Sequence, residues 1–378
     1  MKNNRKVIIM NATFDGSTHE MIDSSIIIIL STIFNCTEVK FLSDRSDKIC
    51  EIVSKRISSN NVVYKPYKIN IKKGAVHDLK GALLEAWTIL SGSKDVLYIS
   101  TFNNMFSCHL NNFVSKITGK KLFMFCHSEV NVIATGKYKI TQIWAYLINR
   151  FFTKTKYGKN VKLIVLGNHI LQSLQLYLKD ERLSHFDYID HPYYRNGSCE
   201  CKHKFDKDNI KIGVIGGVSK YSSHGYENIL SFSKLLATNK SAKIYLISYV
   251  EPQIRNTFPE NVEIVNKSNG YLPRDKYEEA IDKMDYILLP YSSSEYKLIA
   301  SGAVLEAIVR CKPTIMYAND YFTYLAQKFG DFGYFVNHEE IIGELENQAK
   351  YSQFIERELY ISKQISPEQI RKRFIEIL

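Results

Sequence analysis

A serine and a glycine at the start of a helical pattern offer the most specific chemistry in the sequence. Ser301 suits the N-cap of a helix that begins near Gly302, and Ala303 lies in its first turn. The backbone N–H groups of such a turn form an anion site, and this one suits a diphosphate. One turn later, the Glu306 carboxylate can accept hydrogen bonds from ribose hydroxyls. This helix is therefore predicted to recognise a phosphate and a sugar.

The residues before this segment indicate where it lies. The run from Asp285 to Pro290 is apolar and ends in proline, which predicts a buried strand whose carboxyl end leads towards Ser301. An ordinary helix start followed by a solvated glutamate would produce the same short pattern. The pattern alone leaves these two interpretations open.

A histidine and a glutamate follow a second apolar run. His127 comes directly after the predicted strand 122–126, and Glu129 lies two residues later. The carboxyl ends of parallel strands are where α/β proteins bind ligands, so either side chain can act as a general base or hold acceptor hydroxyls. A lone histidine can equally be structural. Asp15 and Gly16, in the first turn of the chain, are further acceptor-side candidates.

The stretch from Leu298 to Thr314 resembles the donor-binding motif of GT-B glycosyltransferases, especially the retaining group 1 enzymes related to family 4. Those enzymes carry a glutamate in a helix, followed by a turn similar to Gly-Lys-Pro. Here Glu306 is followed by Lys312 and Pro313. The segment 189–192 is similar to the end of the acceptor domain in that family.

Two further segments are similar to the family's donor domain, namely the loop 213–230 and the base-holding segment 270–277. The resemblance implies that these residues bind the donor: Gly216, Gly217, Lys220, His224, Gly225, Tyr271 and Leu272. The chain departs from the family at Leu298, where the first glutamate of the paired motif is expected. The usual arginine of the first donor loop is also absent, which leaves Lys220 or His224 as the cation.

Both halves of the sequence open with the same order of elements. An apolar run, a glycine-containing turn and a helical pattern occupy 6–34 and again 210–237. Further strands are predicted at 37–42, 62–67, 96–100, 122–126, 162–166, 186–189, 243–247, 262–265, 286–290, 314–317 and 334–336. Helical patterns separate most of them, which is typical of doubly wound parallel sheets. We therefore predict an α/β protein of GT-B architecture, with two Rossmann-like domains facing each other across a cleft.

Charge differs strongly between the predicted domains. We predict an acceptor-binding domain over 1–198, a donor-binding domain over 209–363, and a last helix over 364–378 that packs back on the first domain. Residues 1–198 contain 27 Lys and Arg against 15 Asp and Glu, whereas residues 199–378 contain 23 against 24. The net charge of +11 thus belongs to the first domain and points to an anionic partner.

Lysines and aromatic residues alternate between 137 and 159, and no acidic residue lies between Glu129 and Asp180. The segment 142–157 is predicted as a helix with an aromatic face and a basic end, which suits an anionic lipid surface. A buried helix with solvated lysines is the alternative. Nucleic acid would suit this composition too, but no nucleic-acid-binding signature accompanies it. With no membrane-spanning run or signal peptide apparent, we predict a cytoplasmic protein, peripheral at the inner membrane face.

The cysteines favour reduced thiols, because the seven are scattered and odd in number. Cys199 and Cys201, followed by His203, lack a second ligand pair at suitable spacing, so no metal site is predicted. No cofactor is expected beside a nucleotide diphosphate sugar as donor substrate. The helix start and Lys220 can neutralise the leaving diphosphate, so Mg²⁺ is not expected to be essential.

These features together predict a glycosyltransferase. It would move a sugar, with retention, from a nucleotide diphosphate sugar to a lipid-linked or polysaccharide acceptor in the synthesis of a cell-surface glycan such as lipopolysaccharide or capsule. A nucleotide-sugar epimerase on the same fold and a non-catalytic sugar-nucleotide-binding protein are the alternatives.

Overall fold

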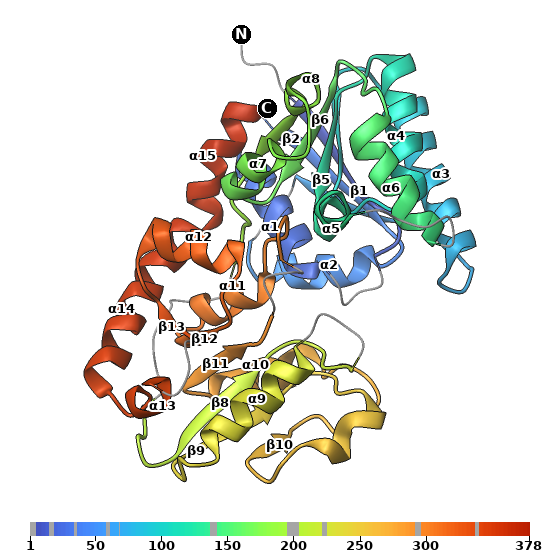
Figure 1. Ribbon diagram of the computed structural model, residues 1–378. Coiled ribbons are helices and arrows are strands. Elements are labelled where there is room, and N and C mark those ends of the chain that lie inside the picture. Colours follow the sequence, from blue (N-terminus) through green and yellow to red (C-terminus); the bar gives the residue numbers. More distant parts are fainter. Residues whose placement is uncertain are drawn as a thin grey trace. The chain divides into compact units, whose positions relative to one another are not determined.

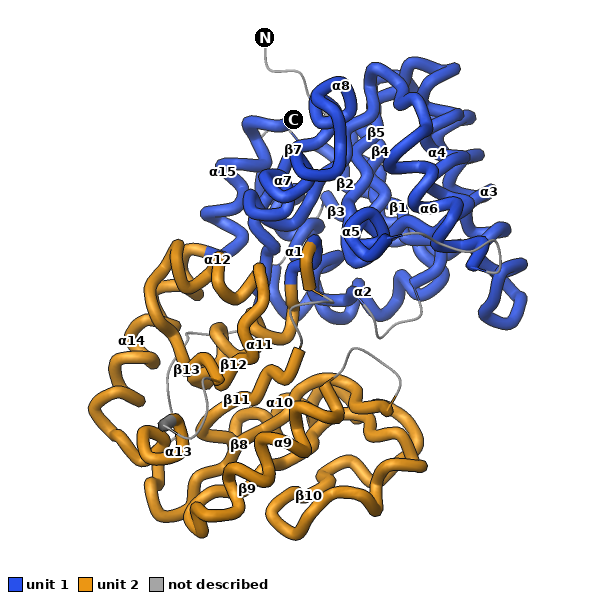
Figure 2. Tube along the Cα trace, viewed as in Figure 1, with its two compact units in different colours: residues 1–196, 298–300, 365–378 blue, residues 197–297, 301–364 orange. Residues whose placement is uncertain are grey.

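Two parallel sheets form the fold, each in its own unit. The computed structural model describes residues 5–14, 19–33, 36–57, 61–67, 69–136, 142–194, 204–220, 225–291, 296–336 and 340–378. Unit 1 comprises residues 1–196, 298–300 and 365–378, and unit 2 comprises 197–297 and 301–364 (Figure 2). Each unit has its own apolar core.

The sheet of unit 1 has seven parallel strands in the order β3-β2-β1-β4-β5-β6-β7. The chain first adds strands on one side of β1 and then returns to add them on the other, so the order reverses between β1 and β4. The strands are β1 (Arg5–Asn11), β2 (Cys36–Ser43), β3 (Val62–Pro66), β4 (Val96–Ser100), β5 (Leu122–Cys126), β6 (Val161–Val165) and β7 (Phe186–Tyr188).

Helices cover both faces of this sheet, because successive side chains of a buried parallel strand point to opposite sides and both sides are apolar. On β1, Ile9 belongs to one core cluster and Met10 to the other. The helices of unit 1 are α1 (Glu20–Ser31), α2 (Ser46–Ser54), α3 (Ala75–Ser91), α4 (Met105–Thr118), α5 (Val132–Thr135), α6 (Ile143–Lys154), α7 (Asn168–Leu174), α8 (Asp180–Leu183) and α15 (Pro367–Ile377), with the 3-10 helix η1 (Ser128–Asn131).

Two helix layers can be followed in Figure 1. One core cluster is shared by α3, α4 and α6, and the other by α1, α2 and α15. The last helix, α15, therefore completes unit 1 although it comes from the end of the chain. Phe374 of α15 is fully buried and stacks on Phe125 of β5, with 6.1 Å between ring centroids. Arg373 pairs with Asp187 of β7.

Unit 2 repeats the plan with six parallel strands in the order β10-β9-β8-β11-β12-β13. The strands are β8 (Ile210–Val214), β9 (Ala242–Leu246), β10 (Val262–Ile264), β11 (Tyr286–Leu289), β12 (Thr314–Met316) and β13 (Gly333–Phe335). The helices are α9 (Tyr226–Leu236), α10 (Arg274–Asp282), α11 (Gly302–Val309), α12 (Asp320–Phe329), α13 (Glu340–Glu344) and α14 (Gln348–Gln364), with the 3-10 helix η3 (Pro252–Thr257). The strand order reverses between β8 and β11.

The predicted fold class is confirmed by these two doubly wound parallel sheets. Every strand expected from the sequence is present, with ends that differ by no more than one residue. The helix expected over 20–34 ends at Ser31 among the described residues. The possible ligands Cys199, Cys201 and His203 lie outside the described residues. No helix in the described part of the chain is long and apolar enough to span a bilayer.

The aromatic stack between α15 and β5 gives a test of how unit 1 is completed. Phe374→Ala is expected to lower the free energy of unfolding of unit 1 by about 3 to 5 kcal/mol, because a fully buried ring is lost and a cavity remains. Ile375, the next residue, is 53% exposed, so Ile375→Ala is the matched control with a much smaller loss. Denaturant unfolding followed by circular dichroism measures both. Equal losses would show that α15 does not depend on this stack.

Candidate functional site

The carboxyl ends of the strands define one edge in each unit, because all strands in a sheet run the same way. Ligands of open α/β sheets bind at this edge, at the point where the strand order reverses. In unit 2 that point lies between β8 and β11, and in unit 1 it lies between β1 and β4. The predicted donor residues follow strands of unit 2, and the predicted catalytic residues follow β5 of unit 1.

The loop after β8 approaches the end of β11 closely, and two glycines make this possible. Gly216 has φ 140°, and a Cβ there would lie 2.7 Å from the Tyr291 hydroxyl. Gly225 has φ 66° at the start of α9, and a Cβ there would lie 2.3 Å from the Pro290 carbonyl oxygen. Any side chain would be strained and would collide. These glycines therefore join the two loops at the reversal point.

The segment 270–277, which is predicted to hold the base, lies next to the same loop. A Cβ on Gly217 would lie 3.7 Å from the Tyr271 hydroxyl, so these two predicted donor residues come together. The Tyr271 ring, which is 64% exposed, lies 5.8 Å from the ring of Tyr249, which follows β9. Leu272 is half-buried beside it. The segment thus offers an exposed aromatic surface at the carboxyl edge.

Helix α11 begins where the sequence predicts, at Gly302, with Ser301 in the N-cap position. The prediction that the Ser301 side chain caps the helix is wrong: the serine is buried, but its hydroxyl makes no capping hydrogen bond. Gly302 has nothing within 4 Å of its Cβ position, and Ala303 is half-buried. The helix start is open and carries no side-chain cap, as an anion site at a helix N-terminus requires.

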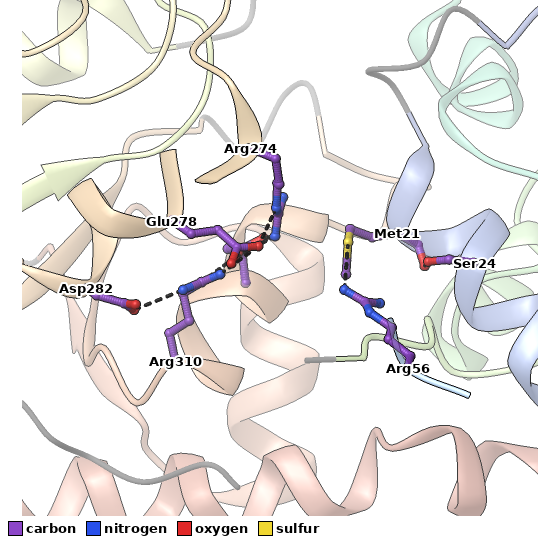
Figure 3. Close-up of polar contacts among 8 residues, drawn as sticks. Met21, Ser24, Arg56, Arg274, Glu278, Asp282 and Arg310 are labelled. Atoms are coloured by element: carbon purple, nitrogen blue, oxygen red, sulfur yellow. Dashed lines mark hydrogen bonds and ion pairs between the residues drawn. The ribbon is translucent and has the colours of Figure 1, made fainter. Parts of the chain in front are cut away.

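Glu306 is buried and ion-paired rather than solvated. Its Oε2 accepts a hydrogen bond of 2.8 Å from Arg274 Nη2, which also lies 3.0 Å from Oε1. Its Oε1 also accepts from Arg310, one turn further along α11. Arg310 in turn pairs with Glu278 at 3.0 Å and Asp282 at 2.9 Å (Figure 3). The network ties α10 to α11 through buried charge.

The carboxylates of this network keep Arg310 protonated. Its side chain is 2% exposed, and this burial acts to lower its pKa. The facing carboxylates of Glu306, Glu278 and Asp282 outweigh burial and raise the pKa above its usual value. Arg274 is one-third exposed, so it is the more readily displaced of the two arginines. A ribose hydroxyl that binds Glu306 must share the carboxylate with Arg274 or displace it.

Lys220 and His224 are the predicted cations of the first donor loop. Lys220 is exposed, and its backbone N–H donates to Glu251 Oε2 at 3.0 Å, which holds the loop to the segment that follows β9. His224 lies outside the described residues. Within the described part of unit 2, Gly216, Gly217 and Tyr271 come together, and the Arg274 ion pair links their neighbourhood to Glu306.

In unit 1, His127 is buried and its tautomer is set by a carbonyl. The Nε2 atom lies 2.7 Å from the Thr101 carbonyl oxygen, which can only accept, so Nε2 carries the hydrogen. Burial lowers the pKa of His127 well below its usual range, and nearby His19 and His191 act in the same direction. The ring is therefore neutral at pH 7, with Nδ1 as a hydrogen-bond acceptor.

Glu129 lies in η1, beside His127, and is 7% exposed. Its Oε2 accepts a hydrogen bond of 2.9 Å from the His127 backbone N–H, whereas Oε1 has no partner among the described residues. Burial raises the pKa of Glu129 to about 7. The carboxyl is therefore poised between its two protonation states near neutral pH, as a general base or a hydroxyl-holding group can be.

Two more buried carboxyls lie at the carboxyl edge of unit 1, and burial raises the pKa of each to about 7. Asp23 accepts a hydrogen bond of 2.7 Å from Asn11 at the end of β1. Glu85 accepts one of 3.0 Å from the Ala12 backbone and one of 2.7 Å from Asn111. Neither residue is among the site residues predicted from the sequence. The predicted acceptor-side residues of the first turn, 15 and 16, lie outside the described residues.

Glu129 lines a pocket of about 520 Å³ that lies wholly within unit 1. Asn103 after β4 and Trp144 of α6 also line it. Leu298 lies nearby, because its backbone N–H donates to Asn131 Oδ1 at 3.0 Å. The Leu298 side chain is fully buried in the core of unit 1, where a glutamate would be an uncompensated buried charge.

Sequence reasoning missed several residues that complete these sites. Arg310 could have been found, because it lies four residues after Glu306 and shares its face of the helix. Arg274 and Glu306 are 32 residues apart and meet only through the packing of α10 against α11. Asn103 gave no signal, because a single asparagine after a strand is common in loops.

The raised pKa of Glu129 predicts a pH-dependent stability. The folded carboxyl keeps its proton to about pH 7, whereas the ordinary value is 4.5, so its contribution to stability falls as pH rises between these values. Glu129→Gln removes this loss. The free energy of unfolding of the variant, relative to the parent, is expected to rise by roughly 1.4 kcal/mol per pH unit over that interval. Glu356→Gln, at an exposed site on α14, is the control, and a flat difference for Glu129→Gln would contradict the assignment.

Comparisons with known proteins bear on the fold. No protein-family profile and no curated protein sequence matches the chain. A solved structure of HepE from Anabaena, in complex with UDP and glucose, is similar with a TM-score of 0.65 and 12% identity over 98% of both chains. WaaG, a glycosyltransferase involved in lipopolysaccharide biosynthesis, is similar with a TM-score of 0.62 and 13% identity over 98% of this chain and 99% of its own.

A candidate UDP-N-acetylglucosamine 2-epimerase from Listeria monocytogenes is also similar, with a TM-score of 0.59 and 10% identity over 98% of this chain and 94% of its own. Sequence identities this low are evidence for a shared fold only. The chain has two doubly wound parallel sheets, and it matches these structures over nearly their full length. These two findings establish that the chain has the GT-B fold.

Proposed function

We propose that the protein is a glycosyltransferase related to the group 1 enzymes of family 4, which uses a nucleotide diphosphate sugar as donor. Unit 2 binds the donor and unit 1 the acceptor. The observation that carries this proposal is the open start of α11, which follows β11 at the strand-order reversal of unit 2. In a GT-B fold this is a site where backbone N–H groups can bind a diphosphate.

The start of α11 and the Lys220 side chain stabilise the leaving nucleotide diphosphate, because both supply positive charge where negative charge develops. Charge compensation from these groups makes Mg²⁺ unnecessary for the reaction. The Tyr271 and Leu272 segment holds the base. Glu306 accepts hydrogen bonds from the ribose, with Arg274 moving aside or sharing the carboxylate.

Unit 1 supplies the groups that handle the acceptor. A hydroxyl donates to Glu129 Oε1 or to His127 Nδ1, and Glu129 near its pKa of about 7 can take up the proton. UDP with glucose in HepE, and the role of WaaG in lipopolysaccharide biosynthesis, support a UDP-sugar donor and a cell-surface glycan product. We propose retention of stereochemistry on the resemblance to the family, although Leu298 replaces one of its glutamates.

The epimerase with the same fold is the second candidate. An epimerase converts one nucleotide sugar into another without a separate acceptor, so the acceptor pocket of unit 1 favours a transferase. Product analysis separates the two: incubation with UDP-N-acetylglucosamine alone gives an epimeric nucleotide sugar from an epimerase, but free UDP and sugar, or no reaction, from a transferase.

We also propose that unit 1 contacts an anionic membrane, through α3 and α4 rather than through the segment 142–157. Phe151, Phe152 and Tyr157 of that segment are buried in the core and cannot face lipid, which leaves only Ile143, Trp144 and Tyr146 at its start as exposed large apolar residues. Helix α3 instead exposes an apolar stripe at helical spacing, and α4 beside it adds two residues (Figure 1). The stripe consists of Val76, Leu79, Leu83, Trp87 and Leu90, together with Phe113 and Ile117 of α4.

Single exposed apolar side chains are normal on a protein surface, but these residues form one apolar stripe, and lysines flank it. The lysines are Lys72, Lys80, Lys94 and Lys116. Apolar residues that enter the headgroup region and lysines that meet lipid phosphates are complementary to an anionic bilayer. Such contact would keep the enzyme near a lipid-linked acceptor.

A single backbone N–H at the start of α11 can be removed to test donor binding. Gly302 is the first helical residue, where proline is tolerated, and Ser301 before it is extended, as a residue before proline prefers. Gly302→Pro deletes the N–H, whereas Gly302→Ala keeps it and adds only a methyl group in open space. UDP affinity, measured by calorimetry, is expected to fall roughly 10- to 150-fold in Gly302→Pro, because a hydrogen bond to a charged group is lost.

Gly302→Ala is expected to bind UDP as the parent does. Equal affinities in all three proteins would remove α11 from the donor site. A parent protein that binds none of a panel of UDP-, GDP-, ADP- and CMP-linked sugars would overturn the proposed function itself. Transfer and hydrolysis assays on the same panel then identify the donor.

Membrane contact can be measured with Trp87, which becomes the sole tryptophan in Trp144→Phe. Its fluorescence is expected to shift to shorter wavelength with vesicles containing phosphatidylserine at low salt, and not with neutral vesicles. In that background, Leu83→Glu is expected to abolish sedimentation with the vesicles. Leu176→Glu is the matched control, because Leu176 is an 81% exposed leucine of the same unit outside the stripe. Equal sedimentation of both variants would disprove this surface.

A further inference from the structure

The pocket beside Glu129 contains two buried oxygen atoms that lack hydrogen-bond donors. Among the described residues, neither Glu129 Oε1 nor Asn103 Oδ1 has a partner. Asn103 is 3% exposed; its amide nitrogen donates to the Phe125 carbonyl at 2.7 Å, and the same side chain also acts by hydrogen bonding to lower the pKa of Glu129, against the larger effect of burial. Both oxygens belong to residues that line the pocket. Because an unpaired buried acceptor costs roughly 1 to 3 kcal/mol, these atoms call for a ligand that donates hydrogen bonds.

The same pocket also has apolar lining residues, two of them on α6. Trp144, with 54% of its surface exposed, and Ile148 line the pocket together with Met105 of α4. An indole face is apolar and carries partial negative charge, so it favours a flat group with C–H bonds directed at it. The pocket therefore combines an apolar aromatic surface with fixed acceptors, and its volume of about 520 Å³ suits a small ligand.

Few classes of ligand suit both the unpaired oxygens and the aromatic surface of this pocket. A purely apolar ligand, such as an acyl chain, would leave the two oxygens unpaired. A phosphate or carboxylate would bring negative charge against Glu129, for which the described residues provide no ion pair. A sugar ring has hydroxyls that donate around its rim and C–H groups on its faces, and so meets the acceptors and the indole together.

We infer that this pocket binds a sugar ring of the acceptor, stacked on Trp144, with hydroxyls donating to Glu129 and Asn103. The inference rests on the proposed function and narrows it: the acceptor is recognised by its sugar, so a soluble glycoside without a lipid suffices. Glu129 then contacts the acceptor directly. Trp144 and Asn103 position the ring.

The chain has only two tryptophans, which makes the pocket directly observable. In Trp87→Phe, all tryptophan emission comes from Trp144. Titration with the methyl glycosides of glucose, galactose, mannose and N-acetylglucosamine is expected to change this emission saturably for at least one sugar. The same sugar is expected to leave the emission of Trp144→Phe, which reports only Trp87, unchanged. No response of Trp144 to any glycoside would count against the inference.

A kinetic measurement is the second test of the acceptor pocket, with Trp87→Phe as the reference protein. With the responding glycoside as acceptor, adding Trp144→Ala is expected to raise the acceptor KM at least tenfold, while UDP affinity stays the same. An unchanged acceptor KM, with either a soluble or a lipid-linked acceptor, would overturn the inference. The two hypotheses fail separately: glycoside binding by a protein that binds none of the panel of nucleotide sugars refutes the proposed function, whereas nucleotide-sugar binding without a Trp144 response refutes only the acceptor pocket.

Discussion

The parallel direction of every strand is the constraint on which both sites depend. Because all strands in a sheet run the same way, their carboxyl ends meet at one edge, and the loops that follow them gather there. The reversal of strand order leaves a gap between two neighbouring loops at that edge. In unit 2 the loops after β8 and β11 meet at this point, and Gly216 and Gly225 are needed because any side chain would collide with the residues after β11.

Buried carboxyls in the two units are stabilised in opposite ways. Glu306 faces Arg274 and Arg310, so its negative charge is compensated within the core of unit 2. Glu129 is hydrogen-bonded by a backbone N–H and by the Asn103 side chain but forms no ion pair with a described residue, and burial raises its pKa to about 7. The first arrangement suits a fixed acceptor of hydrogen bonds, and the second suits a group that exchanges a proton. The difference follows from the neighbours, because both residues are glutamates of similar exposure.

The two tryptophans are both exposed, but their surroundings differ. Trp87 belongs to an outward stripe on α3, on the helix face opposite the buried Glu85 and Ile89. Trp144 lies against a pocket lined by acceptors. Each is exposed, yet a flat apolar surface flanked by lysines suits a bilayer, whereas a concave polar pocket suits a single small ligand.

The sequence by itself determined the class of fold, nearly all strand positions and the start of α11, because these depend on local patterns of apolar residues and on helix-start residues. It also brought out Glu306, His127 and Glu129 by their places after strands or in a helix. Tertiary structure decided what surrounds them. The pairing of Glu306 with Arg274, the raised pKa of Glu129 and the burial of Leu298 arise from residues distant in sequence. Burial and ion pairing are properties of packed neighbours, and no local pattern contains them.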